Sequence, residues 1–390
     1  MSRFEPLSGV RVIDFTRVLS GPYATMTLAE LGADVIKVEM PAVGDETRAW
    51  GPASVNGSSA YFAAVNRGKR SVTLDLGSSE GRLAARQLVS TADVLVENFR
   101  PGVADRLGIG ADEMMAAFPG LIYGSITGFG TSGPLADAAG TEVIVEAESG
   151  LMDVTGMPGA APVRFGVAMV DIATGLALST GVCAALAERA RTGVGRRVDT
   201  SLFATAVSSL GTLIAGSAAD GTTPDRWGSG HPTIVPYRAF EVVDGFVVLG
   251  ATNDAMFTRL VGGLGIDPAE IDAAWSTNAG RINARTDVET VIHRSISHRC
   301  AGDVVTVLRD HGVLVAEVAS AADTASGEQA LALSLFEHHD GIPFSRSPLS
   351  GSDTRPLWRA PQLGEHTAEV FAELNRGADC ASAAAQNRKG

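Results

Sequence analysis

Short apolar runs alternate with helical patterns along the first half of this chain. Residues 10–15 and 34–39 are apolar runs of strand length, and residues 22–32 between them have the spacing of a helix. The unit repeats, with further strand-like runs at residues 71–76, 93–99 and 121–127. Alternation on this scale predicts an α/β fold in which helices cover both faces of a parallel sheet. Ligands of such sheets bind beyond the carboxyl ends of the strands.

The pattern changes near residue 220. Residues 221–230 (GTTPDRWGSG) have the composition of a linker, and residues 240–250 predict a hairpin with an Asp-Gly turn. Helical patterns follow, and a last helix is expected from about Thr367, before a tail after residue 377 that has no packing pattern. We therefore expect a large domain, a smaller domain with a linker and a C-terminal segment at residues 1–220, 221–330 and 331–390.

The composition is that of an acidic globular protein. The 390 residues are 45% hydrophobic, with a mean hydropathy of +0.15, which is enough to bury a large core. The formal net charge of −13 and a pI near 5.0 argue against nucleic acids and anionic membranes as partners, because both require a broad positive surface. A phosphorylated small molecule remains compatible, since it needs only a local cluster of donors.

The cysteines and the start of the chain favour a cytoplasmic protein. Cys183, Cys300 and Cys380 are widely spaced and form no CxxC motif, so we expect neither a disulfide framework nor a zinc signature. No His, Asp and Glu residues have the spacing of metal ligands, and no metal site is expected. The first residues lack an apolar signal region, and we expect no run of the ~20 apolar residues that a membrane helix needs.

Asp171 is the strongest candidate for chemistry. It ends an apolar run at residues 166–170 and precedes a long helical pattern at residues 172–191. A carboxylate among the free N–H groups of a helix start stays ionised and accessible, and it can act as a nucleophile toward an activated acyl group. An ordinary N-cap is the alternative interpretation.

A glycine-rich motif at residues 128–133 (GFGTSG) matches the dinucleotide-binding pattern. It follows a strand, but Pro134 and polar residues come next instead of a helix. The first strand leads into residues 16–22 (TRVLSGP), which contain no such motif. The strand, loop and helix that bind NAD or FAD are therefore missing, and neither cofactor is expected.

Seven segments together are similar to one protein family. In order along nearly the whole chain, they resemble the family III (CaiB/BaiF) CoA-transferases, and the agreement of all seven in register makes the resemblance specific. The segments are DFTRVLSGP at 14–22, LGADVIKVE at 31–39, NRGKRSVTLD at 66–75, VENFRPG at 96–102, SGLMDVTG at 149–156, HPTIVPY at 231–237 and APQLGEHT at 360–367.

The resemblance implies an architecture that spacing alone does not reveal. Members of the family are interlocked homodimers. In each chain a Rossmann-like large domain is formed by the N-terminal half together with the C-terminal segment, and a smaller α+β domain lies between them. The monomer is then not expected to be a stable species.

The resemblance also implies a covalent mechanism. Asp171 matches the family's nucleophile, which forms an acyl anhydride with the donor and then an aspartyl-CoA thioester. Glu142 matches an acidic partner, with a solvated acid at a helix start as the alternative. Gly228 and Gly230 match a flexible loop that closes over the acceptor, with an interdomain linker as the alternative. CoA and its esters are substrates here, and no permanently bound cofactor is implied.

By family position, the CoA contacts include cations for the phosphates and apolar side chains for the adenine. The matching residues are Val18, Lys69, Arg70, Leu74, Asn98, Phe99 and Arg106. This chain has Met40, Gly77 and Ala139 where some relatives carry basic residues, so we expect a partly rearranged set of phosphate contacts.

Two other functions remain open. Related racemases need a histidine where this chain has Thr141, so a second proton carrier is missing. A CoA-ester binding protein without catalysis is compatible with Leu19, where formyl-CoA transferases carry glutamine. For the acceptor, residues 228–240 are similar to dicarboxylate CoA-transferases that use succinyl-CoA. We therefore expect a small dicarboxylate or hydroxy acid, whose distal carboxylate pairs with Arg164, Arg226 or Arg238.

Overall fold

The computed structural model describes residues 4–51, 54–55, 57–346, 348–349 and 356–376, and the expected tail after residue 377 lies outside these ranges. The chain divides into two compact units. Unit 1 comprises the described residues of Met1–Leu151, Arg164–Gly216 and Gly327–Gly390, and unit 2 comprises Met152–Val163 and Ser217–Ser326. Unlike the division expected from the sequence, residues 152–163 belong to the smaller unit.

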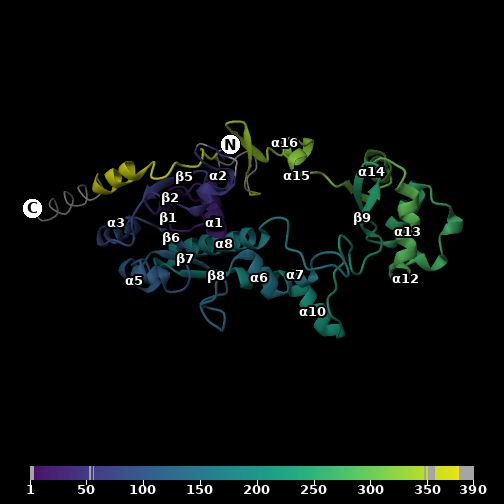
Figure 1. The fold of residues 1–390 in the computed structure, drawn as a ribbon, viewed down its shortest axis with the longest axis horizontal. Coiled ribbons are helices and arrows are strands. Elements are labelled where there is room, and N and C mark those ends of the chain that lie inside the picture. Colours follow the sequence, from purple (N-terminus) through teal and green to yellow (C-terminus); the bar gives the residue numbers. More distant parts are fainter. Residues whose placement is uncertain (1–3, 52–53, 56, 347, 350–355, 377–390) are drawn as a thin grey trace, which may run out of the picture. The chain divides into compact units, whose positions relative to one another are not determined.

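Unit 1 is built on a six-stranded parallel sheet (Figure 1). The strand order is β5-β2-β1-β6-β7-β8, and every pairing is parallel. The order reverses between β1 and β6, which is the point where sheets of this kind bind their ligands. The strands are β1 Arg11–Asp14, β2 Asp34–Glu39, β5 Lys69–Thr73, β6 Val94–Glu97, β7 Ile122–Thr127 and β8 Arg197–Ser201.

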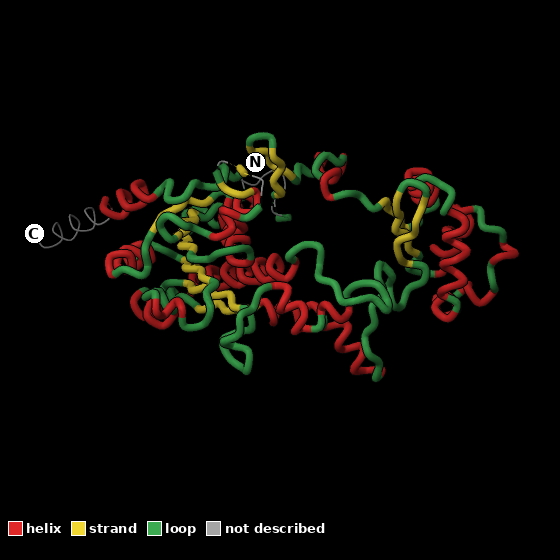
Figure 2. Tube along the Cα trace, viewed as in Figure 1, coloured by secondary structure: helices red, strands yellow, loops and turns green. Residues whose placement is uncertain are grey.

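Helices cover both faces of this sheet, as the apolar strands require (Figure 2). Neighbouring strand residues point to opposite faces: Val12 packs with α1 and α8, whereas Ile13 packs with α3 and α5. The helices of unit 1 include α1 Ser20–Glu30, α2 Ala60–Asn66, α3 Ser79–Val89, α4 Val103–Arg106, α5 Ala111–Ala117, α6 Glu142–Ser149, α8 Met169–Thr192, α9 Leu202–Ser209 and α16 Glu328–Ala332.

The segment that contains the APQLGEHT motif lies along the β5 edge of the sheet. The backbone N–H of His366 donates to the carbonyl of Ser71 over 2.9 Å, and the N–H of Gly68 donates to the carbonyl of Trp358 over 3.0 Å. Residues 367–376 form a helix, and Val370 belongs to the core of unit 1. Residues more than 280 positions apart along the chain thus share one sheet edge.

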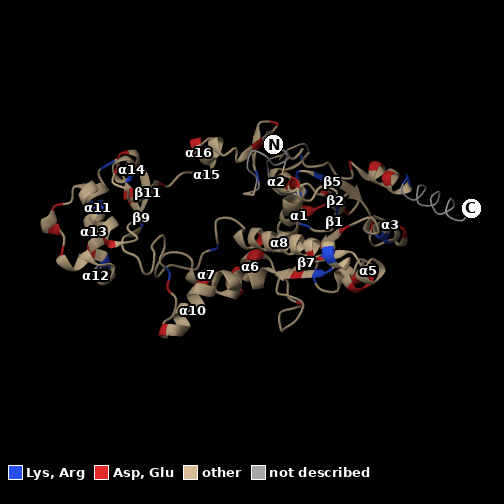
Figure 3. Ribbon diagram, turned by 180° about the vertical axis from the view of Figure 1, so that it is seen from behind, with Lys and Arg blue, Asp and Glu red and all other residues tan. Residues whose placement is uncertain are grey.

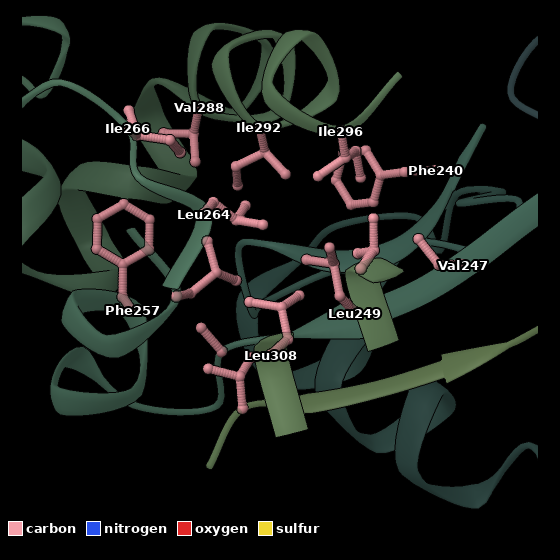
Figure 4. Packing of buried hydrophobic residues seen from close by; sticks show 14 of the residues in the cluster. Phe240, Val247, Leu249, Phe257, Leu264, Ile266, Val288, Ile292, Ile296 and Leu308 are labelled. Atoms are coloured by element: carbon pink, nitrogen blue, oxygen red, sulfur yellow. The ribbon is translucent and has the colours of Figure 1, made fainter. Parts of the chain in front are cut away.

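Unit 2 has an antiparallel sheet with the order β11-β10-β9 and its own apolar core (Figure 4). The predicted hairpin is present, with Asp244 and Gly245 at the turn between β9 and β10. Its strands are β9 Tyr237–Val242, β10 Gly245–Gly250 and β11 Leu314–Glu317, and its helices are α11 Asp254–Leu264, α12 Asn278–Asn283, α13 Arg285–Ile296, α14 Ala301–Asp310 and α15 Ala321–Thr324.

Several elements were absent from the sequence prediction. The edge strand β8 has Val198 as its single apolar residue, so it contributes little apolar signal. A hairpin of β12 Phe336–His339 and β13 Ile342–Ser345 lies in the C-terminal segment, for which no strand was predicted. Two short helices, α7 Leu151–Val154 and α10 Gly211–Asp220, lie where the chain passes between the units.

Among the described residues, α8 is long and apolar enough to span a membrane by length and composition, as is the bent pair of α9 and α10. The expectation that no such run exists is therefore wrong for α8. Its packing is that of a core helix: a Cβ at Gly175 would lie 2.6 Å from the carbonyl oxygen of Ser20 in α1. Asp and Glu residues occur on helices of each unit, in keeping with the net charge of −13 (Figure 3).

Candidate active site

Asp171 lies in the first turn of α8. The helix begins at Met169 with Ala168 as its N-cap, so the alternative of an N-cap at Asp171 is wrong. The apolar run continues into the helix, which therefore starts two residues before the carboxylate. The Asp171 carboxylate is hydrogen-bonded by the side chain of Ser20, at the start of α1. Burial raises the pKa of Asp171 to about 6, and the Ser20 hydrogen bond opposes part of this rise.

Glu142 is the first residue of α6 and caps α8 from outside. Its side chain is 7% exposed, and its Oε1 accepts a hydrogen bond from the N–H of Val170 over 3.1 Å. That N–H is one of the donors a helix leaves free at its start. Burial is the main cause of a Glu142 pKa raised to about 7; the Val170 hydrogen bond lowers it, while the charges of Asp171 and Glu146 raise it. A solvated acid at a helix start does not fit this burial.

Tyr61 of α2 lies close enough to both carboxyls for their charges to act on it, and it was not among the residues predicted from the sequence. Burial, followed by the negative charges of Asp171 and Glu142, raises the pKa of Tyr61 to about 12. Its hydroxyl therefore stays protonated at neutral pH and can donate a hydrogen bond. The ring packs against Trp50 with the centroids 5.3 Å apart. No motif marks Tyr61, because the two carboxyls whose charges act on it are distant in the chain.

Arg164 lies on the chain segment that crosses α6. The N–H of Phe165 donates to Oε2 of the buried Glu146 over 3.1 Å, and the Arg164 Nε donates to the carbonyl of Phe165 over 3.0 Å. The Arg164 side chain is exposed, forms no ion pair within the described ranges, and its charge lowers the pKa of both Glu142 and Tyr61. It remains available to a carboxylate.

The other two candidate arginines belong to unit 2 and already have acidic partners. Arg226 pairs with Asp153 over 3.4 Å and also donates to the carbonyls of Asp153 and Ala160. Arg238 pairs with Glu289 over 2.6 Å. Neither presents a free guanidinium, so their contacts do not favour the carboxylate-binding role predicted for them.

Gly228 and Gly230 lie in a folded loop of unit 2. The N–H of Gly228 donates to the carbonyl of Gly156 over 2.9 Å, and that of Gly230 donates to the carbonyl of Trp227 over 2.7 Å. Gly228 has φ +57°, and a Cβ there would lie 2.6 Å from the sulfur of Met157. The loop is therefore held by hydrogen bonds and packing within unit 2, and it is not a free interdomain linker.

A cavity of about 420 Å³ opens at the carboxyl ends of β1, β2 and β5, with α4 beside it. Two predicted CoA contacts, Leu74 and Phe99, line it, together with Arg17, which the sequence analysis did not single out. The lining also includes uncharged Met40 and Gly77. The remaining apolar lining residues are Phe15, Val38, Val43, Leu76, Val103 and Leu107.

Three further predicted contacts lie near this cavity without lining it. Val18 has φ +67°, and its N–H donates to Oδ1 of Asp45 over 3.4 Å. The amide of Asn98 bonds the backbone of Arg17. Arg106 is exposed at the end of α4.

Lys69 and Arg70 are committed to partners inside the protein. The fully buried Lys69 ammonium lies 3.0 Å from Asp14 and donates to the Asn66 side chain and the carbonyl of Pro22. Burial lowers the pKa of Lys69 to about 8. Arg70 pairs with Asp34, Glu369 and Glu373. These contacts do not favour the predicted role of Lys69 and Arg70 as phosphate ligands, because both charges already have acidic partners. Within the part of the chain that the structure describes, no three His, Cys, Asp or Glu side chains group as metal ligands.

Comparison with known proteins identifies the family. The profile of CoA-transferase family III matches residues 7–367. The chain is 40% identical over 386 residues to the succinate–glutarate CoA-transferase of Agrobacterium fabrum, covering 96% of each chain. It is 37% identical to the succinyl-CoA:glutarate CoA-transferase of Mus musculus, covering 95% of this chain and 87% of that protein. A crystal structure of a CaiB/BaiF family protein from Brucella suis matches with a TM-score of 0.88 at 39% identity, covering 95% of this chain and 100% of that one. This chain therefore belongs to CoA-transferase family III and is a CoA-transferase.

Proposed function

We propose that this enzyme transfers CoA from succinyl-CoA to a small dicarboxylic acid such as glutarate. The names of the two curated relatives support this substrate pair. The observation that carries the proposal is Asp171, a half-buried carboxylate that forms no ion pair with a described residue and whose pKa of about 6 leaves it mostly ionised at pH 7. Arg164, exposed and charged beside Glu142, would pair with the distal carboxylate of the acid.

The first half-reaction loads CoA onto the enzyme. An Oδ atom of Asp171 attacks the thioester carbonyl of succinyl-CoA, the carbon–sulfur bond breaks, and CoA leaves as its thiolate. The thiolate then attacks the Asp171 carbonyl carbon of the mixed anhydride and releases succinate. The product is an aspartyl-CoA thioester, in which the energy of the original thioester is kept.

The second half-reaction returns CoA to the new acid. A carboxylate oxygen of the acceptor attacks the aspartyl thioester and displaces CoA thiolate, giving a second anhydride. The thiolate attacks the acceptor's carbonyl carbon, the new CoA ester forms, and Asp171 is regenerated as a carboxylate. Each step exchanges one leaving group for another, so no oxidant or metal is required by the balance.

Three side chains support these steps. Glu142, with a pKa of about 7, holds a proton at neutral pH for part of the time and can donate it to the oxygen that gains charge. The Tyr61 hydroxyl remains a hydrogen-bond donor because its pKa is about 12. Ser20 orients the Asp171 carboxylate. The different surroundings of the two carboxyls give them different roles, Asp171 as the nucleophile and Glu142 as the acid.

The cavity at the carboxyl ends of the strands is the proposed site for the nucleotide part of CoA. Its apolar wall, including Leu74 and Phe99, would cover the adenine. The exposed Arg106 beside it would meet a phosphate, and backbone groups around Val18 would contact the chain of CoA. Gly228 and Gly230, on the loop of unit 2, would shield the acyl-aspartate from water.

The proposed assembly is an interlocked, obligate homodimer in the cytoplasm. Helix α10 supports an interface, because it buries none of its residues within one chain although it carries Leu213 and Ile214. An obligate interface of this kind buries more than about 2,000 Å². Native mass spectrometry at micromolar concentration is expected to detect dimer, and a mainly monomeric protein would refute this assembly.

A substrate screen tests the function. The enzyme is incubated with succinyl-CoA and a panel of mono- and dicarboxylic acids, and new CoA esters are identified by mass spectrometry. Dicarboxylates are expected to react best, and Arg164→Gln should raise KM for them while leaving monocarboxylates nearly unchanged. Arg226→Gln, which removes an arginine already paired with Asp153, is the control. Equal use of both acid classes, or no effect of Arg164→Gln, would reject this assignment of the acceptor.

A further inference from the structure

Arg17 is the cation best placed to meet an anion in the cavity at the strand ends. It follows Thr16 in the loop between β1 and α1, lines the cavity, and its guanidinium lies 5.5 Å from the centroid of the Phe99 ring. The cavity's other lining cation, Lys37, is fully buried and lies 3.0 Å from Asp45. Within the described residues, Arg17 is the lining cation that has no ion pair.

The acidic side chains of the cavity do not cancel this charge. Glu39 is bonded by Arg48 through both of its oxygens, at 2.7 Å each, and Asp45 is paired with Lys37. Glu46 remains as an exposed acid at the rim. The guanidinium of Arg17 therefore offers a site for a phosphate where Met40 and Gly77 contribute no charge.

The loop that carries Arg17 is held by side chains on every side. Asp14 accepts from the N–H and the hydroxyl of Thr16, at 2.9 and 2.5 Å, and Lys37 donates to the Thr16 carbonyl over 2.7 Å. The Asn98 side chain forms two hydrogen bonds with the backbone of Arg17. Its Oδ1 accepts from the Arg17 N–H over 2.8 Å, and its Nδ2 donates to the Arg17 carbonyl over 2.7 Å. The backbone position of Arg17 is thus fixed by an amide from the next strand end.

The backbone of the next residue, Val18, explains why these hydrogen bonds are needed. Val18 has φ +67°, in the left-handed region that a β-branched residue rarely occupies. Conformations of this kind cost on the order of 1–3 kcal/mol and persist where surrounding contacts enforce them. The side chains of Asn98, Lys37 and Asp45 supply those contacts. The loop is therefore preorganised before any ligand binds.

We propose that Arg17 binds the diphosphate of CoA and that Asn98 is its positioning residue. This rests on the proposed function, and it replaces the expectation that Asn98 contacts CoA directly. The loop leads into the 11-residue helix α1 at the reversal of strand order, where diphosphates bind in related sheets. A guanidinium can bond two phosphate oxygens at once, and the diphosphate is the part of CoA that offers adjacent anionic oxygens.

Calorimetry with three ligands tests the role of Arg17. Arg17→Gln is expected to weaken binding of CoA and of dephospho-CoA by the same factor, at least about tenfold. Binding of pantetheine, which has no phosphate, should not change. Arg100→Gln removes the same charge from an exposed residue two positions after Asn98 that does not line the cavity, and it should leave all three affinities unchanged.

A double-mutant cycle tests the role of Asn98. Asn98→Ala should weaken CoA binding nearly as much as Arg17→Gln, and the double variant should bind no more weakly than the weaker single variant. Asn98→Asp, which keeps the acceptor and loses the donor, provides a second variant if the alanine variant does not fold. Asn278 clasps the backbone of unit 2 in the same way, through Val235 and Thr233, so Asn278→Ala is the matched control.

The outcomes separate this inference from the proposed function. If wild-type enzyme binds CoA and Arg17→Gln binds it within twofold, the role of Arg17 is refuted and the function stands. A loss with CoA but not with dephospho-CoA also refutes it, because the contact would then be to the 3′-phosphate. Additive effects of Arg17→Gln and Asn98→Ala refute the positioning role. Wild-type enzyme that does not bind CoA overturns both proposals.

Discussion

Two sets of carboxyls in unit 1 differ in their ion pairs: Asp14 is paired with Lys69, whereas Asp171 and Glu142 form no ion pair with a described residue. Asp14 is fully buried, and burial alone would raise its pKa, but the charges of Lys69 and Lys37 lower it below its ordinary value. No cation within the described ranges has this effect on Asp171, and burial raises its pKa to about 6. Burial by itself therefore does not mark a reactive group. The missing countercharge leaves Asp171 free to form a covalent bond, whereas the Asp14 network serves the fold.

Of the changes to these carboxyls and their cations, replacing Glu142 is expected to reduce activity strongly. Glu142→Gln should lower the rate of transfer by about 10²–10⁴-fold, the range for a lost acid–base group. The wild-type rate should fall below pH 6, where Asp171 gains a proton, and above pH 7, where Glu142 loses one. Initial rates measured between pH 5 and 9 check this. Because the two carboxyls interact, the apparent pKa values of the acidic and alkaline limbs of the profile describe the pair and not one residue each.

The glutamine variant should lose the alkaline limb, because its amide does not titrate. A variant that keeps both limbs would show that Glu142 does not hold the proton.

Removing Lys69, the cation that pairs with Asp14, should instead lower the stability of the fold. Lys69→Met leaves Asp14 buried beside fewer positive charges and should lower the free energy of unfolding by about 3–5 kcal/mol. Urea denaturation at a fixed protein concentration measures this. Arg196→Met, which breaks the exposed pair with Glu188, is the control and should change the free energy of unfolding little, because solvent screens that pair. If Lys69→Met and Arg196→Met lowered the free energy of unfolding equally, the buried pair with Asp14 would not have the stabilising role given to it here.

Neutralising one aspartate from each group should change stability in opposite directions. The folded pKa of Asp171 is raised from 3.8 to about 6, so its ionised form destabilises the fold increasingly from about pH 4 to 6 and fully above that. Asp171→Asn should therefore stabilise the protein by up to about 3 kcal/mol at pH 8 and little at pH 4. Asp14, whose folded pKa is lowered, contributes stability above its unfolded pKa.

Asp14→Asn should accordingly destabilise the protein at pH 8. Urea denaturation of both variants at pH 4 and 8 tests the pair, and destabilisation by Asp171→Asn at pH 8 would contradict the pKa assignment.

The sequence predicted the features that depend on local pattern. The β2 strand and the hairpin of unit 2 are confirmed, while the catalytic roles of Asp171 and Glu142 stay predictions. The apolar runs mark strands because a parallel sheet is buried on both faces. The sequence placed Asp171 next to the start of a helix, and the structure has both Asp171 and Glu142 in the first turns of helices.

What the sequence did not reveal depends on contacts between distant residues. Lys69 resembled a phosphate ligand, because nothing local shows that Asp14, 55 positions away, neutralises it. Arg226 and Arg238 resembled carboxylate ligands until their partners were known. Tyr61 carries no motif at all. Charge pairing and burial are properties of the fold, so they separate free from committed side chains only in three dimensions.

The most direct test of the account is to trap the acyl group on Asp171. Wild-type enzyme is incubated with succinyl-CoA without an acceptor, treated with hydroxylamine, digested and analysed by mass spectrometry. The account predicts a hydroxamate on the peptide that contains Asp171, its absence in Asp171→Asn, and a transfer rate lower by several orders of magnitude in that variant. An unmodified Asp171 peptide, together with an Asp171→Asn variant that keeps more than a few per cent of the activity, would contradict it.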